Sequence, residues 1–265
     1  MNYKLVAMDM DGTLLNSKLS ITVDTLFAIK KAMEKGVKFT ISTGRPLIGI
    51  KKYIEILGID TPVITYNGAC VVDPITEEVL YTKNLENMDA KRILELGNQY
   101  GTLMCVWSNN TLYANRFEGK LENYRKLSGA IPKLITDYEE LVNQGITKIL
   151  WYDEVSRINQ FVDEIDMNTF DCATSVTSQP YFLEFFNKDV NKGVALDYIG
   201  QKLGIKQEEI VAIGDGLNDL AMIEYAGLGV AMGNAHPKIK EVAKYITATN
   251  DEDGISDVIY ELILN

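Results

Sequence analysis

The sequence predicts an α/β protein: a Rossmann-like parallel sheet with helices on both faces, interrupted by an inserted α+β domain. Strand and helix signals alternate at both ends of the chain, and this alternation is typical of parallel βαβ units. Residues 84–187 lack that alternation and mix helical patterns with strand-like runs. We therefore assign residues 1–83 and 188–265 to a core domain and 84–187 to an inserted α+β domain.

The N-terminal part of the chain predicts a βαβαβ order. We expect strands over 5–8, 37–41 and 63–65, and helices over 21–35 and 46–57. Thr22 suits the cap of the first of these helices, and Pro46 suits the first position of the second. Strands that are joined by helices pair in parallel, so we expect these strands to share one sheet.

The same order returns near the C-terminus, whereas the middle is less regular. In the C-terminal part we expect helices over 193–203 and 218–225 and from Pro237 onward, and strands over 210–213, 228–232 and 245–247. In the inserted domain we expect helices over 90–100 and 155–165, and strands over 103–107, 148–152 and 181–186.

Composition and charge exclude several classes of protein. The 265 residues carry a formal net charge of −11, which argues against a nucleic-acid partner because phosphate backbones are repelled. Cys70, Cys105 and Cys172 form no CxxC pair and indicate ordinary thiols in a reducing compartment. No apolar stretch approaches the length of a membrane span, so we expect a cytoplasmic protein. His236 is the only histidine, which excludes any mechanism that needs two.

A pair of aspartates marks the end of the first predicted strand. Asp9 ends the apolar run, Asp11 follows two residues later, and Gly12 allows a turn. At the edge of a sheet, such a segment can supply a nucleophile, an acid/base group and metal ligands. An Asx turn without chemistry is the alternative for this segment taken alone.

Two further clusters suit a phosphate. Thr43 and Gly44 follow the second strand and offer a hydroxyl and an accessible N–H group near a predicted helix start. Lys192 follows Asn191 at another helix start, where a lysine opposes the helix dipole unless an anion binds there. A plain helix cap and a solvated surface lysine are the respective alternatives.

A fourth cluster, residues 214–219, directly follows an apolar strand. Asp215, Asn218 and Asp219 place hard oxygen ligands on a tight loop, which suits Mg²⁺. An Asp/Asn-rich helix cap is the alternative. All four clusters lie where strands end or helices begin, and ligands of open α/β sheets bind at the carboxyl ends of strands.

Jointly and in this order, the clusters resemble the motifs of the haloacid dehalogenase-like phosphohydrolase superfamily. Residues 65–69, 181–184, 191–193 and 213–223 resemble its Cof-type group, in which an α/β cap lies between the second and third motifs. Within that group the likeness is to bacterial sugar-phosphate phosphatases. The resemblance covers the whole chain and implies a catalytic core with a cap that sets substrate specificity.

The resemblance implies a role for each acidic residue. Asp9 would attack phosphorus and form an aspartyl-phosphate, and Asp11 would act as general acid and then as general base. Mg²⁺ would be bound by the Asp9 carboxylate, the Asp11 main-chain carbonyl and the Asp215 carboxylate. Asp219 would hold a metal-bound water or orient the other ligands, and the sequence leaves this choice open.

The resemblance also implies a set of phosphate-binding groups. The phosphoryl oxygens would be bound by Met10 (through its main-chain N–H), Thr43, Gly44, Lys192 and Asn218. Arg45 and Asn67 are further candidates for substrate contact from the core. Glu184 and the segment 113–115 are candidates in the cap.

The function expected from these features is that of a Mg²⁺-dependent phosphatase. Its partner would be a small phosphorylated metabolite, with sugar phosphates as the favoured class. A phosphosugar mutase and a non-catalytic phosphate-binding regulator are the alternatives. The sequence leaves the physiological substrate and the oligomeric state open.

Overall fold

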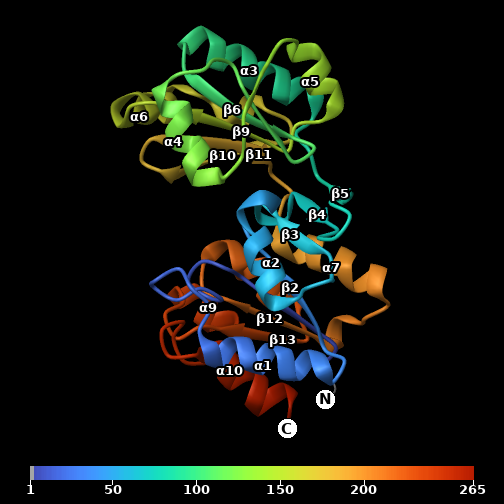
Figure 1. Cartoon of the computed structure of the whole chain (residues 1–265). Helices are drawn as coiled ribbons and strands as arrows, with labels where there is room; N and C mark the ends of the chain where they lie inside the picture. Colours follow the sequence, from blue (N-terminus) through green and yellow to red (C-terminus); the bar gives the residue numbers. More distant parts are fainter. Residues whose placement is uncertain (1–2) are drawn as a thin grey trace. The chain divides into compact units, whose positions relative to one another are not determined.

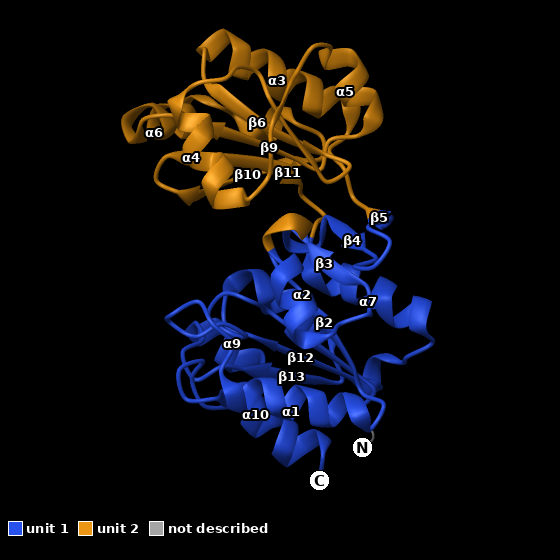
Figure 2. Cartoon of the chain, viewed as in Figure 1, with its two compact units in different colours: residues 1–45, 50–81, 191–265 blue, residues 46–49, 82–190 orange. Residues whose placement is uncertain are grey.

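The computed structural model describes residues 3–265, which divide into two compact units (Figure 2). Unit 1 comprises residues 1–45, 50–81 and 191–265, of which 1–2 are not described, and unit 2 comprises 46–49 and 82–190. The expected cap, 84–187, falls within unit 2. Residues 46–49 pack with unit 2 although they are distant from it in sequence.

Unit 1 is built on a parallel sheet with the strand order β14–β13–β12–β1–β2 (Figure 1). These strands are β1 (Leu5–Met8), β2 (Lys38–Ile41), β12 (Ile210–Gly214), β13 (Leu228–Ala231) and β14 (Tyr245–Ile246). Met8 lies beside Ile41 and Ile213, and the buried side chains of β1 and β12 form the centre of the core. The expected α/β fold is confirmed.

Helices cover both faces of this sheet. They are α1 (Val23–Glu34), α2 (Lys51–Leu57), α7 (Lys192–Leu203), α8 (Leu220–Tyr225), α9 (Pro237–Val242) and α10 (Gly254–Val258), which continues as a π-helical turn, Ile259–Ile263. The chain leaves β1 and β12 toward opposite edges of the sheet, so right-handed crossovers place α1 and α8 on opposite faces. Consistent with this, α1 contacts α2 and α10, whereas α8 contacts α7 and α9.

One sequence prediction for unit 1 is wrong in detail, and one predicted strand has an additional partner. The helix expected from Pro46 begins only at Lys51, after a 3₁₀ turn at Leu47–Gly49. Gly49 disfavours a continuous α-helix at that point. The expected third parallel strand, β3 (Val63–Thr65), is linked to the main sheet by a bridge between Ser42 and Ile64.

The strand β3 also pairs with the next segment of the chain. After the turn at Tyr66–Gly68, the chain reverses and forms β4 (Cys70–Val72), which pairs antiparallel with β3. The strand β5 (Val79–Thr82) completes this small sheet. β3 therefore pairs with β4 along one edge, and on its other edge the carbonyl of Ile64 accepts the N–H of Thr43 just after β2.

Unit 2 contains a mixed sheet with the order β10–β11–β9–β6–β7–β8. Its strands are β6 (Leu103–Ser108), β7 (Thr111–Ala114), β8 (Lys133–Leu134), β9 (Lys148–Tyr152), β10 (Ala173–Gln179) and β11 (Phe182–Asn187). Its helices are α3 (Asn87–Tyr100), α4 (Gly119–Ser128), α5 (Tyr138–Gln144) and α6 (Val155–Glu164). Figure 1 shows these elements in teal, green and gold.

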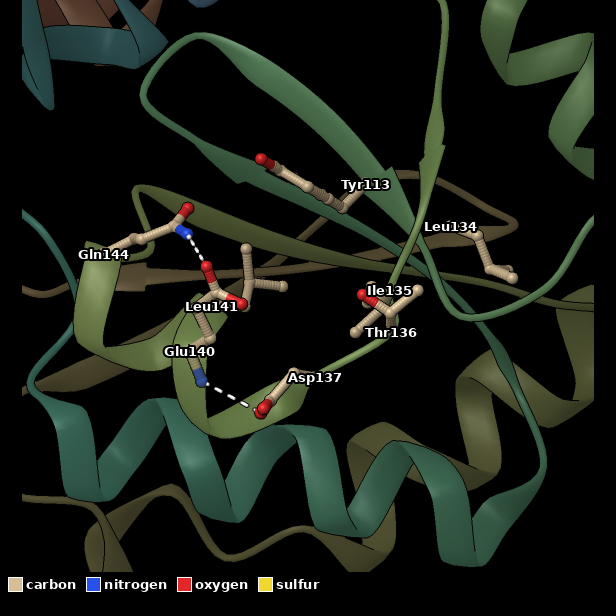
Figure 3. A pocket seen from close by; sticks show the side chains of 8 residues that line it. All are labelled: Tyr113, Leu134, Ile135, Thr136, Asp137, Glu140, Leu141 and Gln144. Carbon is tan, nitrogen blue, oxygen red and sulfur yellow. Dashed lines mark hydrogen bonds between the residues drawn. The ribbon is translucent and has the colours of Figure 1, made fainter.

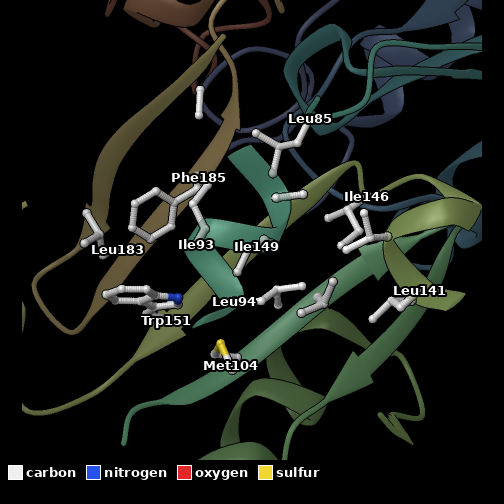
Figure 4. Close-up of a cluster of buried hydrophobic side chains, with 14 of the residues drawn as sticks. Leu85, Ile93, Leu94, Met104, Leu141, Ile146, Ile149, Trp151, Leu183 and Phe185 are labelled. Carbon is white, nitrogen blue, oxygen red and sulfur yellow. The ribbon is translucent and has the colours of Figure 1, made fainter. Parts of the chain in front are cut away.

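Side chains alternate between the two faces of the unit 2 sheet. Ile149 and Trp151 of β9 point into an apolar cluster with residues of α3, α5 and α6 (Figure 4). On the other face, the Nε1–H of Trp107 donates to the hydroxyl of Tyr124 in α4. Within the described residues, no helix is long and apolar enough to cross a membrane.

Candidate active site

The candidate active site begins where β1 ends. The N–H of Asp9 donates to the carbonyl of Ile213 at 2.9 Å, so Asp9 continues the pairing of β1 with β12. This position is the switch point of the sheet, because the strand order reverses between β1 and β12. The Asp9 side chain is buried, whereas that of Asp11 is half exposed.

Lys192 lies between two of the acidic side chains. Its Nζ atom is 2.5 Å from Asp9 Oδ1 and 2.6 Å from Asp219 Oδ1, and the lysine is fully buried. Burial lowers the pKa of Lys192, but the attraction of Asp9 and Asp219 is larger and leaves the net pKa raised. The alternative of a solvated surface lysine is therefore wrong for Lys192.

Burial has the opposite effect on Asp9. It raises the pKa of Asp9 to about 7, because it outweighs the attraction of Lys192 and is reinforced by repulsion from Asp219 and Asp215. A single ammonium group contacts both Asp9 and Asp219, so the negative charge at this site is incompletely balanced. A cation would complete the balance.

Asp219 is fully engaged by protein donors. Its Oδ1 accepts from Lys192, and its Oδ2 accepts the N–H groups of Asp215 and Gly216, each at 2.9 Å. With both oxygens bonded and no exposed surface, this side chain holds the loop after β12 in place. The geometry favours an orienting role for Asp219 over direct metal ligation.

Asp215 keeps one oxygen available. Thr13 Oγ1 donates to Asp215 Oδ1 at 2.8 Å, while no hydrogen bond among the described residues engages its Oδ2 or Asp9 Oδ2. Burial, the largest cause, raises the pKa of Asp215. Gly12 lies beside Asp215 Oδ2, because a Cβ atom at position 12 would be 2.4 Å from that oxygen. The φ of +86° at Gly12 also favours glycine.

The donor set at this site fits a divalent cation. Asp9 and Asp215 can offer carboxylate oxygens to it, and one oxygen of each lies within 4.8 Å of the other and of an oxygen of Asp219. Carboxylate oxygens on a rigid loop are the ligands that Mg²⁺ prefers. Thr13 was not singled out in the sequence, although its place directly after Gly12 could have drawn attention to it.

Thr43 and Gly44 follow β2, beside this acidic group. Thr43 is buried, its N–H donates to Ile64, and its hydroxyl accepts the N–H of Arg45 at 3.2 Å. The helix dipole expected here is weak, because a 3₁₀ turn follows and α2 is short. Any phosphate at this position would therefore depend on local N–H and hydroxyl groups.

Arg45 forms a two-point contact with Asp11. Its Nε atom donates to Asp11 Oδ2 at 2.9 Å, and its Nη2 atom donates to Asp11 Oδ1 at 2.5 Å. Although burial opposes it, hydrogen bonding to Asp11 leaves the pKa of Arg45 raised. No local pattern indicates this pairing, because the two residues are 34 positions apart.

Two asparagines complete the edge of the site. Asn218 is exposed on the loop after β12, and its Nδ2 donates to Asn67 Oδ1 at 3.0 Å. Asn234 was not predicted; its Nδ2 donates to the carbonyl of Gly12 at 2.8 Å. This bond supports the turn that carries Asp11.

The candidate residues in unit 2 are bound within that unit. Glu184 forms an ion pair with Lys148 at 2.8 Å and accepts from Ser178 at 2.6 Å. The Asn115 side chain bonds the main chain of Met104 and Thr102. Within unit 2, both side chains therefore make contacts to protein groups of that unit.

A pocket of about 150 Å³ also lies in unit 2, beside α5 (Figure 3). Its polar groups are bonded to each other: Gln144 donates to Glu140, and the Glu140 N–H donates to Asp137. Tyr113 and Leu134 line another side. None of the candidate catalytic residues contributes to this pocket.

Comparison with known proteins agrees with the geometry of unit 1. The sequence model of the haloacid dehalogenase-like hydrolase family matches residues 6–259. The chain is 36% identical to the 5-amino-6-(5-phospho-D-ribitylamino)uracil phosphatase YcsE of Bacillus subtilis, over 98% of this chain and 96% of that protein. This is a likeness to a phosphatase along the full length.

Solved structures show the same likeness. The crystal structure of TM0651 from Thermotoga maritima superposes with a TM-score of 0.89, at 30% identity over 99% of this chain and 100% of that one. The sugar phosphatase BT4131, of subclass IIB, superposes with a TM-score of 0.77, at 27% identity over 97% of this chain and 98% of that one. The chain therefore belongs to the haloacid dehalogenase-like hydrolase family, and within it to the phosphatases.

Proposed function

We propose that the protein is a Mg²⁺-dependent phosphatase that hydrolyses small phosphorylated metabolites, with sugar phosphates as the favoured class, through an aspartyl-phosphate on Asp9. The observation that carries the proposal is the buried Asp9 carboxylate at the end of β1. One of its oxygens is held by Lys192, and the other accepts no hydrogen bond from the described residues. The likeness to BT4131 supports sugar phosphates as the substrate class.

Asp9 is the proposed nucleophile. Lys192 fixes its Oδ1 at 2.5 Å, so the free Oδ2 has a defined position for attack on phosphorus. Attack forms an acyl phosphate and expels the alcohol, and water then cleaves the acyl phosphate to regenerate the carboxylate. The lysine also reduces repulsion between Asp9 and the phosphate dianion.

Asp11 is the proposed acid/base group. It would protonate the departing alcohol and then remove a proton from the attacking water. In the structure its carboxylate accepts from Nε and Nη2 of Arg45, so it must leave this contact to reach the substrate. Arg45 is then free to bind the incoming anionic oxygen.

Mg²⁺ would be held by Asp9, Asp215 and the main-chain carbonyl of Asp11. When bound, it neutralises the charge shared by the carboxylates and the phosphate. Asp219 positions the loop that carries Asp215, through the two N–H groups that it accepts. The phosphoryl oxygens would be bound by the Met10 N–H, Thr43, Gly44, Lys192 and Asn218.

Unit 2 is proposed to set substrate specificity and to exclude bulk water during turnover. It is joined to unit 1 at positions 81–82 and 190–191, so an independently packed domain interrupts the catalytic one. A cap of about a hundred residues favours small substrates over phosphorylated proteins.

Phosphate release from a panel of phosphorylated metabolites, with and without Mg²⁺, tests this function. We expect turnover of several sugar phosphates with Mg²⁺ and none with Asp9→Asn. Asp24→Asn on the exposed surface of α1 serves as the matched control and should keep full activity. Phosphate release by Asp9→Asn at the wild-type rate would exclude the aspartyl-phosphate, and isomerised product without free phosphate would indicate a mutase.

A further inference from the structure

The turn between β3 and β4 has an unusual backbone. Tyr66, Asn67 and Gly68 have φ values of +51°, +58° and +103°. A side chain with a Cβ atom is rarely found in this region, although asparagine tolerates it better than most residues. Such conformations persist where surrounding contacts enforce them, and they gather at functional sites.

This turn contacts the segments that carry Thr43 and Lys192. The N–H of Asn67 donates to the carbonyl of Thr43 at 2.9 Å. On the other side Gly68 lies against the start of α7, since a Cβ there would be 2.2 Å from the carbonyl oxygen of Asn191. The turn is therefore packed between two of the proposed phosphate-binding segments.

The side chain of Asn67 reaches a third segment. Its Oδ1 accepts from Asn218 Nδ2 at 3.0 Å, which fixes the amide plane of Asn218. The same amide lies over Gly44: a Cβ there would be 2.9 Å from Asn67 Oδ1 and 3.1 Å from Nδ2. The absence of a side chain at Gly44 thus makes room for Asn67 as well as for a ligand.

The other end of this amide is available. No hydrogen bond among the described residues engages Asn67 Nδ2, and the residue is partly exposed. With its oxygen occupied by Asn218, the amide presents two N–H donors between Gly44 and Asn218. Donors of this kind complement an anionic oxygen.

We propose that Asn67 is an additional phosphate-binding residue, which donates from Nδ2 to a phosphoryl oxygen and holds Asn218 in register through Oδ1. This inference rests on the proposed phosphatase function and adds the β3–β4 turn to the site. It also gives a reason for the backbone conformation: the left-handed turn is what directs the Asn67 amide toward Gly44 and Asn218.

Substitution of Asn67 separates a binding role from a structural one. Asn67→Gly removes the amide but adopts the same backbone more readily, so we expect an unchanged or higher melting temperature. Asn67→Asp keeps an acceptor for Asn218 but replaces the N–H donors with a negative charge. Both should weaken the binding of inorganic phosphate, by about tenfold for Asn67→Gly and by more for Asn67→Asp.

The probe is inorganic phosphate titrated calorimetrically into the Mg²⁺-loaded full chain. Steady-state hydrolysis of p-nitrophenyl phosphate gives kcat and KM alongside. Glu77→Gly is the matched control, because Glu77 is also a non-glycine residue with positive φ (+60°) but lies in the turn between β4 and β5. It should bind phosphate like the wild type.

Each outcome decides a different point. Phosphate affinities of both Asn67 variants within twofold of wild type would overturn the inference. A folded Asn67→Gly with weakened binding supports it; if that variant fails to fold, Asn67→Asp decides, because its side chain has the same shape. Failure of the wild type itself to bind or hydrolyse phosphate esters would instead refute the proposed function.

Discussion

At the scale of single residues, the site is a balance of buried charges. Asp9, Asp215 and Asp219 converge, and Lys192 contacts only Asp9 and Asp219 among them. The raised pKa values of Asp9 and Asp215 are the consequence, with burial as the largest cause of each. A carboxyl group whose pKa is higher in the folded state keeps its proton up to a higher pH in that state than in the unfolded state.

This balance predicts how stability depends on pH without metal. The pKa of Asp9 rises from 3.8 to about 7 on folding, so between these values the folded state binds more protons than the unfolded state. The free energy of unfolding should therefore fall as the pH rises toward 7, by on the order of 3 kcal/mol between pH 5 and pH 8. Urea unfolding in EDTA measures this loss.

Asp9→Asn is the control for that experiment, because an amide does not titrate in this range. The variant should lose less stability than wild type between pH 5 and pH 8. Added Mg²⁺ should restore most of the wild-type loss at pH 8, since it replaces the proton as the balancing charge. Parallel pH profiles of wild type and variant would contradict the assignment.

The sequence predicted which side chains lie near the end of β1 better than it predicted their hydrogen-bond partners. Asp9, Thr43, Lys192 and Asp215 were recognisable because each follows a strand or starts a helix, and such signals are local. The pairing of Arg45 with Asp11 has no local signal, since it depends on how β1 and β2 lie side by side. The same holds for Asn234, which reaches Gly12 across 222 positions.

At the scale of elements, capping residues explain why most helix boundaries were predictable. Thr22 accepts the N–H of Thr25 at the start of α1, and Asn191 accepts that of Val194 at the start of α7. The prediction failed for the helix expected from Pro46, where Gly49 lies in a 3₁₀ turn before α2. The strand expected over 63–65 is present as β3, but its pairing with β4 was not predicted, because it depends on the turn that follows.

Asp89 allows the contact between α3 and the start of β10 to be tested directly. It is buried in the first turn of α3 and accepts three main-chain N–H groups just before and at the start of β10: those of Asp171, Cys172 and Ala173, at 3.2, 2.8 and 2.8 Å. Asp89→Ala leaves these donors unpaired, so the free energy of unfolding should fall by about 3 kcal/mol or more.

Urea denaturation measures that loss, and hydrogen exchange at residues 171–173 localises it. Asp89→Asn keeps one acceptor oxygen and should lose less. Asp163→Ala, on the exposed surface of α6, is the control and should be nearly neutral. Equal losses for Asp89→Ala and Asp163→Ala would show that the three bonds contribute nothing.

At the scale of the whole molecule, each unit has its own internal charge pair. In unit 2, Lys148 and Glu184 form an ion pair with little exposed surface. Burial alone would raise the pKa of Glu184, but the attraction of Lys148 and its hydrogen bond lower it overall. This pair therefore stabilises unit 2 above about pH 4.5, and its contribution is lost as the pH falls through the lower folded value.

Glu184→Gln should destabilise unit 2 by about 3 kcal/mol at pH 7, because it leaves the Lys148 ammonium group buried without a counter-charge. Hydrogen exchange should accelerate in β6, β9 and β11. Replacing both members of the ion pair, as Lys148→Met with Glu184→Leu, should recover most of the lost stability.

The same hydrogen-exchange measurement tests the proposed metal site of unit 1. Mg²⁺ should slow exchange at residues 9–14 and 214–219, where its proposed ligands lie.

The pairing of β1 with β12 has a consequence for synthesis on the ribosome. β1 emerges first, yet its partner begins only at Ile210, so the centre of the unit 1 sheet must wait for most of the chain. Residues 82–190, which make up nearly all of unit 2, emerge in one stretch and can pack earlier. Until β12 is made, the edge of β1 that pairs with it has no partner strand, so we expect the nascent chain to expose unpaired backbone groups beside apolar side chains.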